Sequence, residues 1–542
     1  MENKINKVLC RIFACIMTAV AGVLLLFSLV STTHVTGVDT VFYVGDSAWL
    51  HVMVLGALTG IGIILKKRKV GVPWAVIIIA GAAVLVLLTL YVHQAGLHPK
   101  FDQRRVLQIA EDAGNGVYDE FLPGGYLDVY PQQNGVVLLY EFIYRRFEYM
   151  DYMVIQYLNV LMMGIFVAGF GVLIRMLLPG HEKAAVAGTI FFLPFWGYVT
   201  QIYGNLPAMA FGVWAMILTV RYCREERIWQ ALGMSLLMMI AVIMKENFLI
   251  LLIALEIIIL FHVITKKRLK LLIGALLCVV FVFAGVKGTD ALMRSQTGIA
   301  QDQGVSMLSY YAMGMHEHAE RGAGWYDGYN EEAYEAGGYN TAKASEVAKG
   351  DIRKSYQNFR EHPAYFVGFY IRKAACMWND PTCDSIAMQW GRWSDREPGA
   401  LAKPVISEGD FTAFLEHIMN LCWTPLLFGV LVYFISAFKR EDRFEYYLPA
   451  IFFIGGFLFH FFIWETGSYY TFYYMIMLIP YAVYGWSIFC ELIPKLETKR
   501  LVLLAGAAVC LALILSLPQT ASLLTLNRDN ARYAEYLLTL PV

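Results

Sequence analysis

The sequence predicts an all-α protein that crosses a membrane many times, and three observations point to this class. Of the 542 residues, 58% are hydrophobic and only 16% are charged, and the mean hydropathy is +0.53. Apolar stretches long enough to cross a bilayer, about 20 residues each, recur along the chain. Lysine and arginine gather in alternate short loops between these stretches, as they do in polytopic membrane proteins.

Net charge and composition exclude several other classes. The chain has 43 basic and 43 acidic residues, so its formal charge is zero and no overall positive field would attract a nucleic acid. Glycine, proline and charged residues are neither abundant nor periodic enough for a collagen-like, coiled-coil or disordered chain. Membrane lipid is therefore the expected surrounding, and nucleic acid is not an expected partner.

We expect about thirteen transmembrane helices, because a bilayer core needs roughly 20 apolar residues of helix. They lie near residues 8–30, 47–65, 72–92, 153–175, 184–203, 206–221, 228–244, 248–264, 271–287, 418–438, 446–464, 472–491 and 501–517. The first follows Lys4, Lys7 and Arg11, as in a signal peptide, but it lacks a small-x-small cleavage site. It is therefore expected to remain as an anchor.

The basic clusters predict the orientation of these spans. They fall at residues 66–69, 221–227, 266–270, 439–443 and 495–500, whereas the short loops 31–46, 204–205 and 466–468 contain neither lysine nor arginine. We expect a cytoplasmic N-terminus and an extracytoplasmic C-terminus in the plasma membrane. If the short apolar stretch 136–144 crossed the membrane, every later basic cluster would lie on the opposite side. It is therefore expected to be a helix on the outer surface.

This layout divides the chain into four parts. Residues 1–287 form an N-terminal transmembrane region with a large outer loop at 93–152, residues 288–417 an extracytoplasmic loop domain, residues 418–517 the C-terminal transmembrane helices, and residues 518–542 an outer tail. Cys376 and Cys383 are a cysteine pair in an outer loop. Whether they form a disulfide is left undecided, because their spacing in the sequence does not establish the geometry of a bridge.

The distribution of ionisable residues favours an enzyme over an ion-coupled transporter. A transporter of that kind places acidic groups within its spans, but the expected spans hold few ionisable residues apart from Glu256, His262, His460 and Glu491. Charged and aromatic side chains gather instead in the outer loops. Chemistry is therefore expected at the extracytoplasmic interface.

The first large outer loop is the most informative segment. It contains His98-Pro-Lys-Phe-Asp102-Gln-Arg104-Arg105, which opens an amphipathic helix about ten residues after a span, and later the turn Tyr126-Leu-Asp-Val-Tyr130-Pro131. Asp102 is thereby expected at the membrane surface, where it serves either as a reactive carboxylate or simply as the N-terminal cap of the helix.

This loop resembles that of the polyprenyl-phosphate-sugar-dependent glycosyltransferases of the GT-C superfamily. The resemblance lies in a span followed by Pro-x-x-Asp, an amphipathic helix, a Tyr-x-x-x-Tyr-Pro turn, a surface helix and a second span. It is closest to the bacterial relatives of the protein mannosyltransferases and the lipid A aminoarabinose transferases. It implies a catalytic base in the first loop, which we expect to be Asp102; Asp119 or Glu120, similar to the paired acids of the mannosyltransferases, is the alternative.

The resemblance also implies the substrates. The donor is a monosaccharide on a polyprenyl-phosphate carrier, and the acceptor is a cell-envelope glycan, lipid or protein. An acceptor hydroxyl needs a carboxylate to take its proton, and a base of this kind contributes about 10²–10⁴-fold. The leaving phosphate is already an anion and needs cationic or hydrogen-bonding stabilisation. No cofactor is required by this scheme.

Outer-face residues supply candidates for these contacts. Lys245, with Arg104 or Arg105, is expected to bind the phosphate, and Arg321 is a further candidate. Glu465 is expected to bind sugar hydroxyls. Tyr130 and Tyr469 either contact the sugar or belong to an interfacial aromatic belt.

Three alternatives remain open. His316, His318 and Glu320 could hold a metal, but spacing of two residues would splay them across a helix, and no metal is expected. The protein could instead be a transporter or flippase for a lipid-linked sugar, which would need polar residues through its spans. A polysaccharide polymerase or ligase that uses outer-loop arginines is the third alternative.

Overall fold

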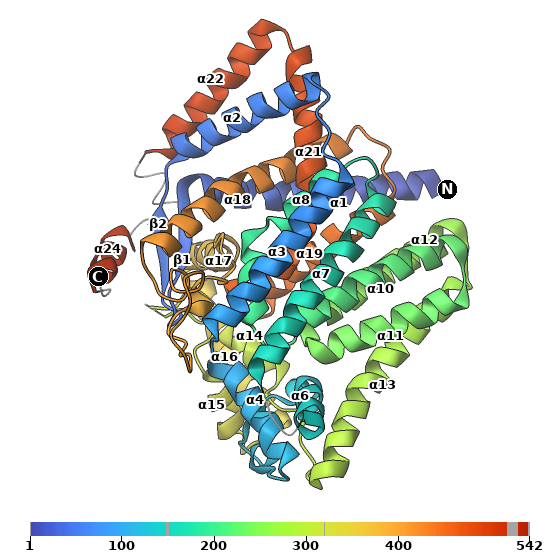
Figure 1. Cartoon of the computed structure of the whole chain (residues 1–542), viewed down its shortest axis with the longest axis vertical. Helices are drawn as coiled ribbons and strands as arrows, with labels where there is room; N and C mark the ends of the chain where they lie inside the picture. Colours follow the sequence, from blue (N-terminus) through green and yellow to red (C-terminus); the bar gives the residue numbers. More distant parts are fainter. Residues whose placement is uncertain (1, 148–150, 319, 518–528, 540–542) are drawn as a thin grey trace.

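The computed structural model describes residues 2–147, 151–318, 320–517 and 529–539, and it confirms an all-α polytopic membrane protein. Within these residues eleven helices are long and apolar enough to cross a membrane. The described strands are β1 (Ser31–Val35) and β2 (Val41–Gly45), which form one antiparallel hairpin between the first two long helices. Figure 1 shows the long helices as a bundle, with α2 and α22 side by side at one end.

Most long helices fall where hydropathy predicts them. They are α1 (Glu2–Val30), α2 (Ala48–Lys67), α3 (Trp74–Ala95), α7 (Tyr152–Leu177), α10 (Asn205–Glu225), α12 (Leu249–Lys266), α13 (Leu271–Thr297), α18 (Asp410–Ala437), α19 (Leu448–Phe462), α21 (Ile479–Leu492) and α22 (Thr498–Leu515). The span Ser468–Lys495 begins with η7 (Ser468–Tyr470), α20 (Phe472–Met475) and η8 (Ile476–Leu478), continues as α21 and ends with η9 (Ile493–Lys495). Residues 228–244 form α11 (Ile228–Met244), an apolar helix of 17 residues.

The expectation of a continuous helix over residues 184–203 was wrong. This stretch is divided into α8 (Glu182–Ile190), α9 (Leu193–Gly197) and η3 (Tyr198–Thr200). Pro194 lies at the start of α9, and Phe192 before it is extended. Proline lacks a backbone donor and disfavours helical geometry in the residues before it, so an apolar run of sufficient length does not become one helix.

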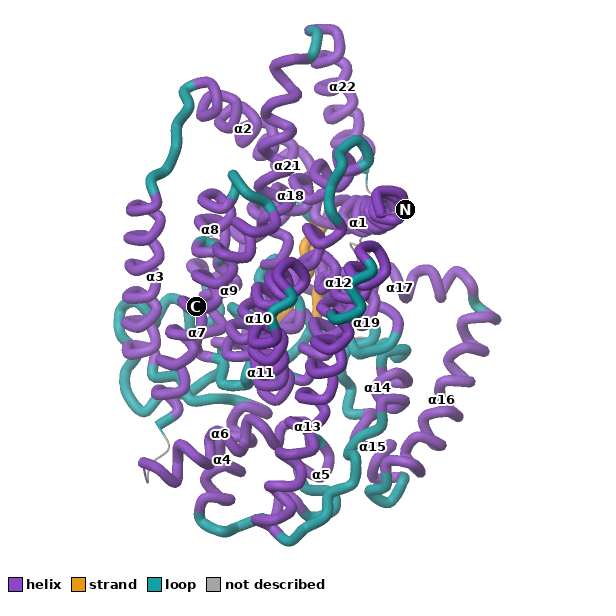
Figure 2. Tube along the Cα trace, turned by 90° about the vertical axis from the view of Figure 1, so that its right-hand side faces the viewer, coloured by secondary structure: helices purple, strands orange, loops and turns teal. Residues whose placement is uncertain are grey.

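The segments expected on the outer side are also mainly helical. They contain α4 (Phe101–Gly114), η1 (Asp119–Phe121), α5 (Tyr126–Val129), η2 (Pro131–Gln133), α6 (Asn134–Phe147), α14 (Met307–Met313), α15 (Tyr329–Ala336), α16 (Thr341–Glu361), α17 (Pro363–Trp378) and η5 (Ala387–Gln389). The short apolar stretch 136–144 does form a helix, α6, which packs on α4 and α13. Figure 2 shows α4, α5, α6 and α15 gathered at the lower end of the molecule.

Two boundaries of the expected loop domain fall inside helices. α13 continues past residue 287 to Thr297, and α18 already begins at Asp410. Hydropathy marks where a helix leaves the apolar layer and not where its hydrogen bonding ends. Cys376 and Cys383 are both free and buried, so they are not bridged; the Cys376 thiol instead faces the hydroxyl of Thr466.

Contacts between loops fall into two sets. On the expected outer side, α24 (Asn530–Thr539) lies on β2, with Asn530 accepting from the backbone of Gly45 at 2.8 Å. On the expected inner side, Asn6 donates to the carbonyl of Asp442 at 2.7 Å and Arg224 pairs with Glu445 at 2.9 Å. The tail residues 518–528 and 540–542 lie outside the described part of the chain.

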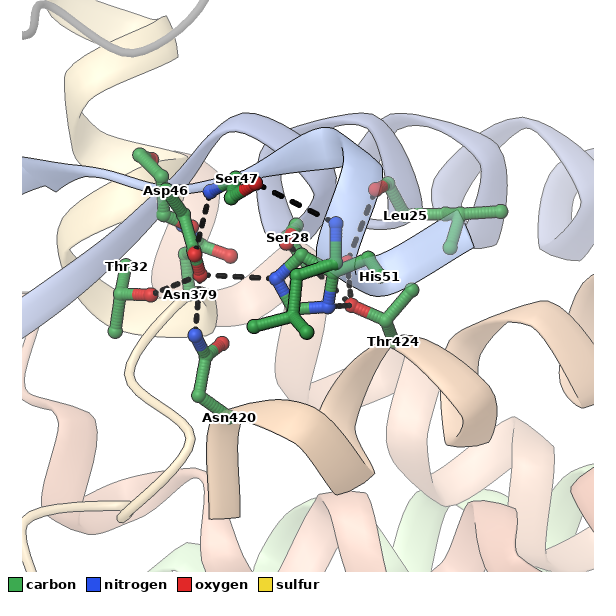
Figure 3. Close-up of polar contacts among 11 residues, drawn as sticks. Leu25, Ser28, Thr32, Asp46, Ser47, His51, Asn379, Asn420 and Thr424 are labelled. Atoms are coloured by element: carbon green, nitrogen blue, oxygen red, sulfur yellow. Dashed lines mark hydrogen bonds and ion pairs between the residues drawn. The ribbon is translucent and has the colours of Figure 1, made fainter. Parts of the chain in front are cut away.

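A buried polar cluster connects the first hairpin to the bundle (Figure 3). Asp46 Oδ2 lies 2.9 Å from His51 Nε2 and also accepts from Thr32 and Asn420. The other ring nitrogen of His51 lies 3.0 Å from the hydroxyl of Thr424. Buried polar groups need partners, and these contacts join the hairpin and α2 to α18.

The crossing of α18 and α21 depends on two glycines. A Cβ added to Gly485 would overlap the carbonyl oxygen of Gly429 on the facing helix. The two backbones therefore approach more closely than any side chain allows.

Gly485→Val is expected to destabilise the protein by about 3 kcal/mol, the upper end of the usual cost of overpacking, because the obstacle is backbone that cannot rotate away. Thermal unfolding in detergent measures the effect. Gly506→Val on α22 is the matched control, since its added side chain meets open space. Equal melting temperatures for the two variants would contradict the close crossing.

Candidate functional site

A cavity of about 400 Å³ lies between the first large loop, the α11–α12 turn and the turn after α19. Of the residues that the sequence singles out, Asp102, Tyr130, Lys245, Glu465 and Tyr469 line it. Arg321, a further phosphate candidate, also lines it. Three distant parts of the chain thus bring a carboxylate, an ammonium and a second carboxylate to the same cavity.

Asp102 occupies the first turn of α4 and is exposed to the cavity. The hydroxyl of Tyr203 donates to Asp102 Oδ2 at 3.4 Å, and Tyr203 is itself 3.1 Å from the hydroxyl of Tyr126. The surrounding walls raise the pKa of the Asp102 carboxyl above its usual value, while the Lys245 ammonium and the tyrosine hydroxyls oppose this rise. A carboxylate with a raised pKa is a stronger base than a solvated one.

Lys245 lies at the turn between α11 and η4 (Glu246–Phe248), where the helix ends and the backbone is extended. Its side chain is buried, with Nζ 4.2 Å from the centre of the Tyr203 ring and 6.0 Å from that of Tyr470. Burial lowers the pKa of Lys245 to about 8, and the carboxylates of Asp102 and Glu465 limit the decrease. An anionic ligand in the cavity would stabilise its charged form.

Glu465 is 4% exposed in the turn after α19, and its two oxygens differ. Oε1 accepts from the hydroxyl of Tyr470 at 2.7 Å, whereas Oε2 is buried without a hydrogen-bond partner among the described residues. Burial raises the pKa of Glu465 to about 7. A buried acceptor without a partner is costly, so a ligand hydroxyl that donates to Oε2 would be favoured.

Aromatic side chains form much of the remaining wall. They are Phe101, Tyr130, Tyr203, Tyr310, Trp325, Tyr326, Trp464, Tyr469 and Tyr470. Tyr130 is held by Glu331, which also accepts from Tyr326 at 2.8 Å. The rings of Tyr310 and Trp464 stack at 4.0 Å. Tyr130 and Tyr469 therefore face a cavity shared with carboxylates, a combination that suits a hydroxyl-rich ligand with apolar faces.

The structure does not bring every sequence candidate to the cavity. Arg104 is exposed on α4, and Arg105 pairs with Glu120 of η1; none of the three lines the cavity. Glu120 also accepts from the backbone of Tyr126 at 2.9 Å, which makes it part of the loop framework. Asp119 is exposed in η1 and does not line the cavity. Among the three acids considered, Asp102 is the one placed at the cavity.

Sequence reasoning missed other charged residues of the wall. Lys100 donates to the carbonyls of Gly37, Ala387 and Trp390, the last at 3.0 Å, and so joins the first hairpin to the η5 segment. Asp384 is buried in a left-handed backbone conformation, and burial raises its pKa well above the usual value. Lys100 could have been identified in the sequence, because it lies two residues before Asp102. No local motif marks Asp384.

No protein-family model, curated protein or solved structure matches this chain. Inference about its function therefore rests on its own residues and their geometry.

Proposed function

We propose that the protein is an integral membrane glycosyltransferase. It moves a monosaccharide from a polyprenyl-phosphate carrier to a hydroxyl of a cell-envelope glycan, lipid or protein at the extracytoplasmic face of the plasma membrane. The convergence of Asp102, Lys245 and Glu465 on one cavity is the observation that carries this proposal. Each of the three suits a different part of such a reaction.

In the proposed step, the acceptor oxygen attacks the anomeric carbon as the bond from that carbon to the phosphate oxygen breaks. Asp102 takes the acceptor proton, and the polyprenyl phosphate departs as an anion. Lys245 stabilises the charge that develops on the phosphate. A single displacement assisted by one base inverts the anomeric centre, as it does in inverting hydrolases.

Other residues of the cavity recognise the sugar in this proposal. Glu465 Oε2 accepts from a sugar hydroxyl, and Tyr469 and Tyr130 contact the ring faces. Arg321, whose guanidinium donates to the carbonyl of Tyr326, adds a second positive charge to the cavity beside Lys245. This arrangement requires no nucleotide and no redox cofactor.

Transfer from radiolabelled polyprenyl-phosphate sugars tests the proposal. The purified protein is placed in liposomes with a set of donors and an envelope extract as acceptor, and the label that leaves the lipid is counted. Label in the acceptor fraction supports the transferase. Absence of transfer with every donor, together with movement of intact labelled lipid between leaflets, would replace it with a transporter.

The pH profile of this reaction gives a further prediction. Because burial lowers the pKa of Lys245 to about 8, kcat/KM should fall above pH of about 8 as the ammonium loses its proton. The acid limb depends on both carboxyl groups of the cavity, because the pKa of Asp102 is raised above the usual value of 3.8 and burial raises the pKa of Glu465 to about 7. Lys245→Arg keeps its charge to much higher pH, so this variant should lose the alkaline limb while retaining the acid one. An unchanged alkaline limb would show that another group titrates there.

A further inference from the structure

Two histidines and an aspartate meet outside the cavity, in the loop between α14 and α15. The possible ligand atoms of His316, His318 and Asp327 all lie within 4.8 Å of one another. His316 Nδ1 and His318 Nε2 each lie 2.8 Å from the same oxygen, Asp327 Oδ2. Glu320, which the sequence grouped with the histidines, is not part of this cluster.

We propose that His316, His318 and Asp327 bind a divalent transition-metal ion, with zinc as the best fit. Zinc takes imidazole nitrogen and carboxylate oxygen at about 2.0–2.2 Å in tetrahedral geometry, which places ligand atoms about 3.3 Å apart. The present separations of 2.8 Å need only small side-chain adjustments to reach it. Imidazole ligands disfavour Mg²⁺ and Ca²⁺. Three protein ligands leave the fourth position to water.

The surroundings orient these ligands. Asp327 is largely buried, 8% exposed, and its other oxygen accepts from the backbone of Tyr329 at 2.9 Å. The ring of Tyr329 meets that of His316 edge to face at 4.8 Å, and its hydroxyl donates to Asp351 at 2.7 Å. Supporting contacts of this kind fix ligand orientation in metal sites. Asp327 and His316 are therefore held in place beside the start of α15, and the more exposed His318 completes the cluster.

The ion would fix one wall of the cavity. The chain between the ligands carries Arg321, Trp325 and Tyr326, which line the cavity. The same segment is already joined to the turn that carries Glu465, because Thr466 donates from its backbone to the carbonyl of Gly324 at 2.7 Å. Bound metal would close the loop into a ring whose ends are His316 and Asp327. Its role is to order the loop, and it contacts neither Asp102 nor Lys245.

Cobalt binding tests the site without any assay of transfer. The full chain is purified in detergent, treated with a chelator, and titrated with Co²⁺, whose visible absorption reports a four-coordinate site with nitrogen ligands. We expect one site that zinc displaces. His318→Ala and Asp327→Asn should each weaken binding about 10-fold or more. His362→Ala, an exposed histidine outside the cluster, should leave it unchanged.

Two further readouts keep the result clear. Size-exclusion profiles show whether each variant is folded, and zinc should raise the melting temperature of the wild type and of His362→Ala but not that of His318→Ala. Absence of the cobalt absorption in the wild type would overturn the proposal, as would equal metal affinity in His318→Ala. The cluster would then be a set of hydrogen bonds to Asp327 alone.

Discussion

Asp102→Asn is expected to lower the rate of sugar transfer by about 10²–10⁴-fold, the usual contribution of a general base. Asparagine preserves the size of the side chain and can still accept from Tyr203, but it cannot take a proton from the acceptor. Donor affinity should change little, because the phosphate is assigned to Lys245. The loss should therefore appear in kcat rather than in KM.

Asp119→Asn is the matched control for this prediction. Asp119 belongs to the same loop and was an alternative base, but it is exposed in η1 and does not line the cavity. Both variants are measured for transfer at equal protein levels in liposomes. Full activity of Asp102→Asn would refute the assigned base, and selective loss in Asp119→Asn would move the base along the loop.

Hydropathy predicts the long helices of this protein well and the irregular ones poorly. A stretch such as 72–92 must form a helix in a bilayer, because its backbone groups have to form hydrogen bonds within the segment. The structure has α3 there. The stretch 184–203 is also long and largely apolar, but it contains Pro194 and forms three short pieces. Helix ends such as Thr297 depend on the residues that cap and pack there, which hydropathy does not describe.

The candidate site was partly predictable for a related reason. Asp102, Lys245 and Glu465 each interrupt or follow an apolar run at the same predicted face, so topology alone places them in one layer. Which of these residues reaches the cavity also depends on the face of the helix that carries each side chain. Arg104 lies two residues after Asp102, and positions two apart do not share a helix face; it accordingly does not line the cavity. Asp384 comes from a segment without regular structure, where neither periodicity nor topology gives a direction.

Lys245→Met is expected to weaken donor binding by about 10–100-fold, since hydrogen bonds to charged groups contribute about 1.5–3 kcal/mol. Methionine keeps the length of the side chain and its packing between Tyr203 and Tyr470. Removing a buried charge should not unfold the protein, because the ammonium is only 8% exposed and its burial is already unfavourable. The change is thus specific to anion recognition.

Competition between labelled donor and a polyprenyl phosphate without sugar measures this effect, because both share the phosphate. Arg104→Gln is the control, as Arg104 was an equal candidate in the sequence but does not reach the cavity. We expect the inhibition constant to rise in Lys245→Met and to stay constant in Arg104→Gln. The reverse result would place the phosphate on the outer surface of α4. Equal loss for a polyprenyl alcohol, which carries no charge, would show that Lys245 supports the shape of the cavity and not the binding of an anion.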